Sequence, residues 1–350
     1  MVLPLAVSRN FQTLKQPSLF VSIAAFCDPF LRFTLESLFA QASAPASVAV
    51  GVVDQSTEPL NDWVAEQPFV DQVRYLHVDP VHSRGVCWAR HLAQSLYDDE
   101  DWFLQVDSHT WFTPGWDDHL HAHMDRLGAL SDRPVLSIYP PGFEFDDQGR
   151  PVKKITPTQN VAYFTVKPGQ EFSADKRVLT FRVAYQSLPQ GQGKASDDLW
   201  YYGRSFHLAG GFMLAPGRFV SEVPYDPLFY FHGEEQGLAL RAYTRGWDLF
   251  TPQFHRVPLF HLYKTPSSVS PNLHWRKDLE LRRKIKWPER RARAWMRLND
   301  LVAGRLDPPY GLGGMRSLAD FTELSGIDYS GLQINRVHPT VVEAFPEQST

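Results

Sequence analysis

The chain is predicted to be an α/β protein in which helices wrap a parallel β-sheet. Strand-like apolar runs alternate with segments of helical periodicity over the first third of the sequence, a pattern typical of strand–helix–strand units. The 350 residues, 43% of them hydrophobic, suffice for one large α/β domain or two modest ones. Several apolar runs end in polar residues, and ligands bind such sheets at the carboxyl ends of the strands.

The elements of the first third follow from periodicity and residue type. Apolar and β-branched runs predict strands at residues 18–28, 47–55, 73–79 and 102–107. Apolar residues recur at helical spacing from Phe30 to Phe39, directly after Pro29, and proline is favoured in the first turn of a helix. A second helix is expected from Gly85 to the acidic turn that follows it, and residues 61–67 are expected to be helical.

The later part of the chain alternates less regularly. A strand is expected at 134–139, and residues 140–200 are expected to be irregular because they are rich in Pro, Gly and Gln. Compact domains usually connect their elements in about 4 to 6 residues, so an insertion of this size is predicted to be functional. The remaining expected elements are an amphipathic helix within 233–252 closed by Gly246, an apolar strand carrying His261, and two basic helical pieces within 275–300 split at Pro288.

Composition excludes several classes of protein. A net charge of -4 gives no global attraction to nucleic acid or to an acidic membrane surface. Two cysteines, Cys27 and Cys87, are too few for a disulfide framework and lack the paired spacing of a zinc site. The N-terminus lacks the pattern of a signal peptide, and no apolar run reaches the roughly 18 residues of a membrane helix. We therefore expect a cytoplasmic protein without a membrane partner.

The stretch DWFLQVDSHTWF ends a predicted strand in an acid, a hydroxyl and an imidazole. Alternate residues of an extended segment point to the same side, so Asp107 and His109 can offer an oxygen and a nitrogen to one cation. Such a mixed pair suits Mn2+ or another intermediate divalent metal. The competing interpretation is that Asp107 caps a turn and His109 is an ordinary, partly buried histidine. His261 is the candidate third ligand, with a structural histidine as the alternative.

Two segments carry a family resemblance: SRGVCWARHLAQSLYDDEDWFLQVDSHTWFTPGWD at 83–117 and HGEEQGLALRAYTRGWDLFTPQFHRVPLFHLYK at 232–264. Together they resemble glycosyltransferase family 60, the UDP-GlcNAc-dependent polypeptide α-N-acetylglucosaminyltransferases, which include the enzyme that modifies hydroxyproline on Skp1. That family is similar to the polypeptide GalNAc-transferases, which share a DxH motif, a GG(F/L) segment, a GGE-like segment and a later histidine. The resemblance runs from about residue 18 to 264, and residues 310–329 resemble the family's C-terminal stretch.

The resemblance implies a GT-A glycosyltransferase fold: one Rossmann-like nucleotide-sugar-binding domain with a mixed central sheet and a C-terminal helical extension. The implied boundaries are an N-terminal extension at 1–17, a catalytic domain at 18–265 with an acceptor insertion at about 140–205, and a catalytic-loop and basic helical extension at 266–350. The implied cofactors are Mn2+ or another divalent metal and a UDP-sugar donor. Asp107, His109 and His261 become the metal ligands.

The resemblance also assigns residues to the nucleotide-sugar. These are Ala25, Phe26, Asp28, Arg84, Arg90, Ser108, Gly210, Gly211, Lys264 and Arg276. Arg84 and Arg90 flank the glycine-bearing segment that approaches the nucleotide in related enzymes, and an exposed helix arginine is the alternative for Arg90. Phe26 to Asp28 match the place that receives the uracil, although Asp28 is also suited to cap the helix after Pro29.

Gly210, Gly211 and Lys264 each have an alternative interpretation or a departure from the related enzymes. Gly210 and Gly211 would let the backbone approach the sugar, where a side chain would collide with it, or they form a tight bend in a strand. Lys264 stands where the GalNAc-transferases have an arginine, so a point charge replaces a bidentate fork. The diphosphate contact is then expected from Lys264, or from Arg276 with Lys277.

Two adjacent acids are the candidate catalytic residues. Glu234 aligns with the carboxylate that the related enzymes place beside the donor sugar, and Glu235 is its neighbour. Acids at a helix N-terminus also occur because the helix dipole favours them. The resemblance implies retention of the α configuration, and a covalent intermediate would need one of these acids as nucleophile. We prefer front-face attack, in which the leaving phosphate takes the acceptor proton and Glu234 positions the sugar.

The predicted reaction is transfer of a sugar, GlcNAc before GalNAc or glucose, from a UDP-sugar to Ser, Thr or hydroxyproline of a protein. A glycan or small-molecule acceptor, a non-catalytic nucleotide-sugar-binding module and a metal-dependent phosphodiesterase are the alternatives. Trp200 and Tyr201, in an aromatic group with Tyr185 and Tyr202, are candidate acceptor residues, unless they belong to the core. The basic stretch 276–297 would dock an acidic acceptor protein or simply present solvated helix faces.

Overall fold

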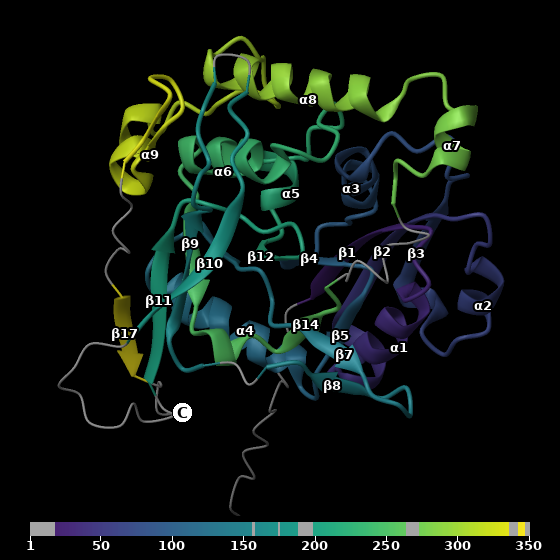
Figure 1. The fold of residues 1–350 in the computed structure, drawn as a ribbon. Coiled ribbons are helices and arrows are strands. Elements are labelled where there is room, and N and C mark those ends of the chain that lie inside the picture. Colours follow the sequence, from purple (N-terminus) through teal and green to yellow (C-terminus); the bar gives the residue numbers. More distant parts are fainter. Residues whose placement is uncertain are drawn as a thin grey trace, which may run out of the picture.

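The protein is described by a computed structural model that covers residues 18–155, 158–173, 176–187, 199–263, 273–335 and 342–346. Within these residues a nine-stranded mixed sheet forms the centre, in the order β17-β11-β13-β6-β12-β4-β1-β2-β3 (Figure 1). Its strands are β1 Leu19–Phe26, β2 Val48–Gln55, β3 Val73–His77, β4 Trp102–Asp107, β6 Pro134–Ser137, β11 Leu199–Ser205, β12 Phe212–Pro216, β13 Asp248–Pro252 and β17 Val342–Pro346.

The first four strands form the parallel half of the sheet. β1 lies between β2 and β4, with Ile23 paired to Val52 on one side and to Val106 on the other. β1, β2 and β4 read as nearly continuous apolar runs because helices cover both of their faces. All four strands run in the same direction, so Phe26, Gln55 and Asp107 come to the same edge.

The other half of the sheet makes it mixed. β12 runs antiparallel to β4 and to β6, β6 and β13 are parallel, and β11 is antiparallel to β13 and to β17. The expectation of a parallel sheet therefore holds for the first four strands, and the mixed sheet implied by the family resemblance describes the whole. The reversal at β12 brings the loop before it, with Gly210 and Gly211, next to the end of β4.

Helices cover both faces of the sheet. They are α1 Leu31–Gln41, α2 Asn61–Ala65, α3 Val86–Gln94, α4 Trp116–Gly128, α5 Phe219–Glu222, α6 Glu234–Thr244, α7 Lys277–Arg282, α8 Trp287–Val302 and α9 Leu318–Ser325, with 3-10 turns at Pro45–Ser47, Val70–Gln72 and Phe254–Arg256. In the view of Figure 1, α3, α5 and α6 lie above the sheet and α1 and α4 below it, while α7, α8 and α9 form an outer layer. No described helix combines the length and the apolar character that crossing a membrane would require.

The insertion at 140–205 is more regular than expected. It contains two antiparallel ribbons, β7 Phe143–Phe145 with β8 Pro151–Lys153 and β9 Val161–Val166 with β10 Phe181–Gln186, and then enters β11. The strands are short, and the segments between them are rich in Gly and Pro. The sequence therefore shows no clear strand pattern here. Two further ribbons pair β5 Thr110–Phe112 with β14 Leu259–His261, and β15 Ile327–Asp328 with β16 Gln333–Ile334.

The basic helices of the C-terminal part are confirmed, with a shifted boundary. α7 ends at Arg282 and α8 begins at Trp287, so the break precedes Pro288, which lies in the first turn of α8. A proline is tolerated there because the first amides of a helix have no intrahelical partner. The predicted extension at 1–17 lies outside the described residues.

Candidate active site

A cavity of about 580 Å³ opens at the carboxyl ends of β1 and β4. Most of the predicted site residues line it: Phe26, Asp28, Arg90, Asp107, Ser108, His109, Gly210, Gly211, Glu234, Glu235 and His261. The insertion contributes the wall from Val178 to Phe181, at the start of β10. The structure thus brings together segments that are more than 200 residues apart in the sequence.

The end of β4 is held in place by α1. Thr34, a buried residue of α1, donates a hydrogen bond to the carbonyl of Ser108 (2.8 Å) and accepts one from the amide of Thr110 (3.0 Å). The Thr110 hydroxyl also donates to the carbonyl of Asp107 at 2.8 Å. These bonds fix the turn that presents Asp107 and His109 to the cavity.

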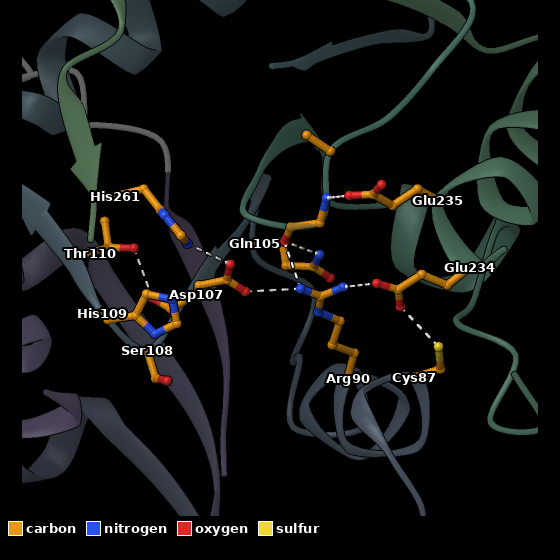
Figure 2. Close-up of polar contacts among 12 residues, drawn as sticks. Cys87, Arg90, Gln105, Asp107, Ser108, His109, Thr110, Glu234, Glu235 and His261 are labelled. Carbon is orange, nitrogen blue, oxygen red and sulfur yellow. Dashed lines mark hydrogen bonds and ion pairs between the residues drawn. The ribbon is translucent and has the colours of Figure 1, made fainter. Parts of the chain in front are cut away.

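Asp107, His109 and His261 form a candidate metal centre. One possible ligand atom from each lies within 4.8 Å of the others, and the described residues contain no second such group. β14 pairs with β5 so that His261 lies opposite Thr110, which places the histidine beside the end of β4 (Figure 2). The rings of the two histidines are 4.6 Å apart between centroids, and His261 Nε2 is 3.0 Å from Asp107 Oδ2. One carboxylate oxygen and two imidazole nitrogens suit Mn2+ or a similar divalent ion, so the residues fit the predicted metal.

Asp28 orients one of these histidines. Its Oδ2 accepts hydrogen bonds from His109 Nδ1 (2.6 Å) and from the Ser108 hydroxyl (2.8 Å), and its Oδ1 accepts from the amide of Phe30 (3.0 Å). A carboxylate only accepts, so Nδ1 carries the proton and Nε2 keeps the lone pair. Burial acts to raise the pKa of Asp28, but the hydrogen bond from His109 and the other two donors outweigh it, and this pKa lies below its usual range. Asp28 thus supports His109, and its bond to the amide of Phe30 precedes α1, whose N-terminus has no side-chain cap.

Replacing Asp28 with asparagine is expected to weaken Mn2+ binding by about 10–100-fold, the usual cost of losing a carboxylate behind a ligating histidine. The measurement is a Mn2+ titration by calorimetry, with Asp147→Asn, which changes an exposed carboxylate, as the matched control. Because the pKa of Asp28 is lowered in the fold, its stabilising contribution is present above its unfolded pKa and is lost as the pH falls through the folded value. Asp28→Asn should therefore flatten the loss of stability in acid. Equal Mn2+ affinities in the two variants would contradict this role.

Arg90 links the metal centre to the predicted sugar-positioning acid. Its Nη2 lies 3.0 Å from Asp107 Oδ1 and its Nη1 lies 2.8 Å from Glu234 Oε1 (Figure 2). The guanidinium also donates to the carbonyl of Gly210 at 3.0 Å, and it is almost fully buried. The thiol of Cys87 donates to the second oxygen of Glu234 at 2.9 Å. Arg90 is therefore part of the site and not an exposed helix arginine.

The electrostatics of this group reflect a balance between burial and pairing. Burial alone would raise the pKa of Asp107, but the hydrogen bond to His261 and the charge of Arg90 hold it well below its usual range. Burial raises the pKa of Glu234, and Arg90 opposes that rise. Burial disfavours the charge of Arg90, yet Glu234 outweighs it and the pKa of Arg90 is raised. The guanidinium of Arg90 therefore keeps the buried carboxylate of Glu234 and the partly buried carboxylate of Asp107 close together.

The glycine pair makes room for protein groups. A Cβ on Gly210 would come within 2.8 Å of Arg90 Nη2 and closer still to Nη1. A Cβ on Gly211 would lie 3.0 Å from Asp107 Oδ2. Both glycines also line the cavity, so their predicted closeness to a sugar stays a prediction. In the structure, Gly210 lies against the side chain of Arg90, and Gly211 lies against that of Asp107.

Glu235 is held by a separate set of donors. Its Oε1 accepts a hydrogen bond from the amide of Gly210 at 2.7 Å, and its Oε2 accepts one from the Tyr139 hydroxyl at 2.8 Å. His207 Nε2 lies 3.5 Å from the same Oε2. Burial acts to raise the pKa of Glu235, but His207 and the other donors lower it overall. Glu235 therefore braces the glycine loop, whereas Glu234 pairs with Arg90.

A series of hydrogen-bonded polar side chains lies at the end of the cavity near Phe26. The amide of Gln55 donates to the carbonyl of Ala25 (2.8 Å), Ser83 donates to Gln55 (2.5 Å), and His274 Nε2 lies 2.9 Å from Ser83 Oγ. The ring of His274 lies 4.8 Å from that of Phe26. Burial lowers the pKa of His274 to about 3, so this imidazole is neutral. Gln55, Ser83 and His274 thus shape the end where the nucleobase was predicted.

Five other predicted residues are not among those that line the cavity. Trp200 and Tyr201 are buried in β11, and Trp200 packs against His123 and the guanidinium groups of Arg126 and Arg256. The remaining placements are Ala25 buried within β1, Arg84 exposed over the ring of Trp88, and Arg276 in an ion pair with Asp278. Lys264 lies outside the described residues.

Several cavity residues were not predicted. Tyr139 is the last residue of the strand expected at 134–139 and lies just beyond β6, which ends at Ser137, so its place at a strand end was a usable signal. Tyr230, Phe231 and His232 directly precede the predicted acids and line the cavity beside them. No sequence pattern predicted His274, because this residue lies in the C-terminal part of the chain and reaches the site only through tertiary packing.

A family model and solved structures relate the chain to glycosyltransferases. A family model described as "Glycosyltransferase (GlcNAc)" matches residues 18–68 and 61–330. The crystal structure of GalNAc-T7 with UDP, GalNAc and Mn2+ is similar, with a TM-score of 0.53 and 17% sequence identity over 88% of this chain and 54% of that one. S. aureus TarS 1-349 in complex with UDP-GlcNAc gives a TM-score of 0.42 and 15% identity over 73% of this chain and 62% of that one. No curated protein sequence matches the chain.

The likeness to GalNAc-T7 defines the fold. The chain spans about half the length of the GalNAc-T7 chain, with 54% of it covered. At 17% identity the likeness establishes a common architecture, and the predicted GT-A fold with its mixed sheet is confirmed.

Proposed function

The chain belongs to the Glycosyltransferase (GlcNAc) family, and from this premise we propose that it transfers a sugar, GlcNAc foremost, from a UDP-sugar to a hydroxyl acceptor. The acceptor hydroxyl would be that of Ser, Thr or hydroxyproline in a protein, and the transfer would retain the α configuration. The finer assignment to glycosyltransferase family 60, with the Skp1-modifying enzyme as a relative, is part of the same proposal. It rests on the motifs at 83–117 and 232–264.

One observation carries the proposal. The candidate metal ligands Asp107, His109 and His261 share one cavity with the paired acids Glu234 and Glu235. A phosphodiesterase that uses two metals would need more clustered carboxylates. A GalNAc-T7 structure contains UDP, GalNAc and Mn2+, which supports the same ligand classes for this cavity.

The metal would be held by Asp107, His109 and His261. When bound, a divalent ion supplies positive charge against the departing diphosphate. Asp28 keeps the Nε2 of His109 available, and the β5–β14 ladder holds His261. These groups are set before substrate binds, so no reorganisation is needed at the moment of reaction.

The acids would position the sugar. Arg90 and Cys87 each donate a hydrogen bond to Glu234. The remaining lone pairs of the carboxylate accept hydrogen bonds from hydroxyls of the donor sugar. Arg90 ties Glu234 to Asp107, so the acid cannot move independently of the metal ligand. In the front-face route the leaving phosphate accepts the acceptor proton, and neither acid forms a bond to the sugar. Glu235 keeps the glycine loop against the cavity.

The test is release of UDP from UDP-GlcNAc, UDP-GalNAc and UDP-glucose, with Mn2+, Mg2+ or EDTA present. We expect slow hydrolysis that prefers one donor and stops in EDTA, and NMR of the early product should show the α-anomer. Binding of UDP is measured in parallel by calorimetry, because a transferase can require its acceptor for turnover. Absence of both metal-dependent UDP binding and turnover would refute the proposed function.

A further inference from the structure

A line of aromatic and cationic side chains leads from the mouth of the cavity along α8. It begins with Phe231 and Trp275, which line the cavity with their ring centroids 6.4 Å apart. These rings are 49% and 37% exposed, unusually open for large aromatic side chains. Trp275 lies 6.0 Å from Trp287, the first residue of α8. The aromatic surface at the mouth of the cavity therefore extends to the start of α8.

Cations cover the aromatic rings farther along α8. The guanidinium of Arg291 lies 4.7 Å from the ring of Trp287 and 5.0 Å from that of Trp295. The ammonium of Lys176, which precedes β10, lies 5.9 Å from the ring of Trp295. We call the connected set the α8 ridge: Phe231, Trp275, Trp287, Arg291, Trp295 and Lys176.

The α8 ridge carries two positive charges, those of Lys176 and Arg291. Within the described residues neither Lys176 nor Arg291 forms an ion pair, nor does the adjacent Arg290. The cavity residue His232 has a pKa lowered by burial and then by the charges of Arg291 and Lys176, so both cations act on the mouth of the cavity. The whole chain carries a net charge of -4, so the concentration of unpaired positive charge here is local.

We infer that the acceptor is a polypeptide segment with acidic residues beside its hydroxyl, bound across the mouth of the cavity and along the α8 ridge. The inference rests on the proposed function and adds the chemical character of the residues that flank the acceptor hydroxyl. Carboxylates would pair with Lys176 and Arg291, and apolar side chains would cover Phe231 and Trp275. A neutral glycan would leave the cations unpaired, and Arg291 already occupies ring faces on which a sugar would stack. A polyol phosphate has no apolar groups to cover the two exposed rings.

The experiment uses synthetic peptides that share a central Thr, Ser or hydroxyproline and differ only in flanking residues, which are acidic, neutral or basic. The readout is the ratio of kcat/KM for the acidic peptide to that for the neutral peptide, from mass spectrometry of the glycosylated product. Each variant serves as its own reference, so a loss of folding or donor binding cancels. We expect a ratio of at least about 10 in low salt that falls as salt screens the charges.

The double variant Lys176→Glu and Arg291→Glu should bring the ratio to one or below. Arg150→Glu is the matched control and should leave it unchanged, because Arg150 is exposed on the β7–β8 hairpin, at the opposite end of the view from α8 (Figure 1). Turnover with a ratio near one in the unmodified protein, or transfer to glycans and not to peptides, would overturn the inference while the proposed function stands. No turnover and no metal-dependent UDP binding would instead refute the proposed function.

Discussion

Replacing Asp107 with asparagine is expected to reduce metal-dependent UDP release by about 10³-fold, because a metal contributes several kcal/mol and each 1.4 kcal/mol is tenfold. Asp107 is the one carboxylate of the candidate metal centre, and its partners His261 and Arg90 both favour its charged form. An amide of the same shape keeps the packing but removes the charge that a divalent ion requires. The measurement is UDP release at saturating Mn2+, with Mn2+ affinity determined by calorimetry.

Two comparisons separate this effect from unfolding. Asp147→Asn changes an exposed carboxylate outside the cavity and should keep full activity. His261→Ala should resemble Asp107→Asn, because it removes another ligand of the same centre. If Asp107→Asn melts at the same temperature as the unmodified protein and turns over normally, the metal centre has been assigned to the wrong residues.

Replacing Arg90 with methionine is expected to destabilise the fold by about 3–5 kcal/mol, because breaking a buried ion pair leaves an uncompensated charge. Here two carboxylates, Asp107 and Glu234, lose the same partner. The pKa of Glu234 is already raised by burial, and without Arg90 it should rise further. A group with a raised folded pKa destabilises as the pH rises through that value, so the deficit of Arg90→Met should shrink in acid. Urea unfolding at several pH values measures this.

A second substitution tests whether Glu234 is the source of the deficit. Adding Glu234→Gln to Arg90→Met should recover part of the lost stability, because a neutral amide can remain buried without a cation. Arg282→Met removes an exposed arginine of α7 and should cost less than about 0.5 kcal/mol. Arg90→Lys keeps one charge but cannot bridge both acids, so it should lower activity more than stability. A loss below 1 kcal/mol for Arg90→Met, on the scale of a surface change, would contradict the bridging role.

The parallel half of the fold could be predicted because its signals are local. The apolar runs at β1, β2 and β4 are continuous, and Pro29 marks the start of α1. The insertion could not be predicted in the same way. β9 and β10 pair although residues 167–180 separate them in the sequence, and Leu179, just before β10, donates a hydrogen bond from its amide to Gln236 of α6. Contacts between such distant residues leave no local pattern.

The candidate metal centre has a local signal in the sequence. Asp107 and His109 are two residues apart at a predicted strand end, and the family motif adds His261. The expected extended geometry is wrong, because Ser108 and His109 lie in a turn after β4. The role of Arg90 could not be predicted from the sequence, because its partners come from β4, α6 and the glycine loop and meet only in the folded chain. Trp200 and Tyr201 show the converse: aromatic residues in a functional-looking insertion that packing places in the core.

The contact between Asp107 and His261 joins distant parts of the chain. The two residues are 154 positions apart in the sequence, and the ladder between β5 and β14 places His261 beside the end of β4. A divalent ion held by both side chains, as proposed above, would bind the folded domain and neither half of the chain alone. Its binding free energy would then add to the stability of the whole domain, and chelation would lower that stability as well as remove a cofactor.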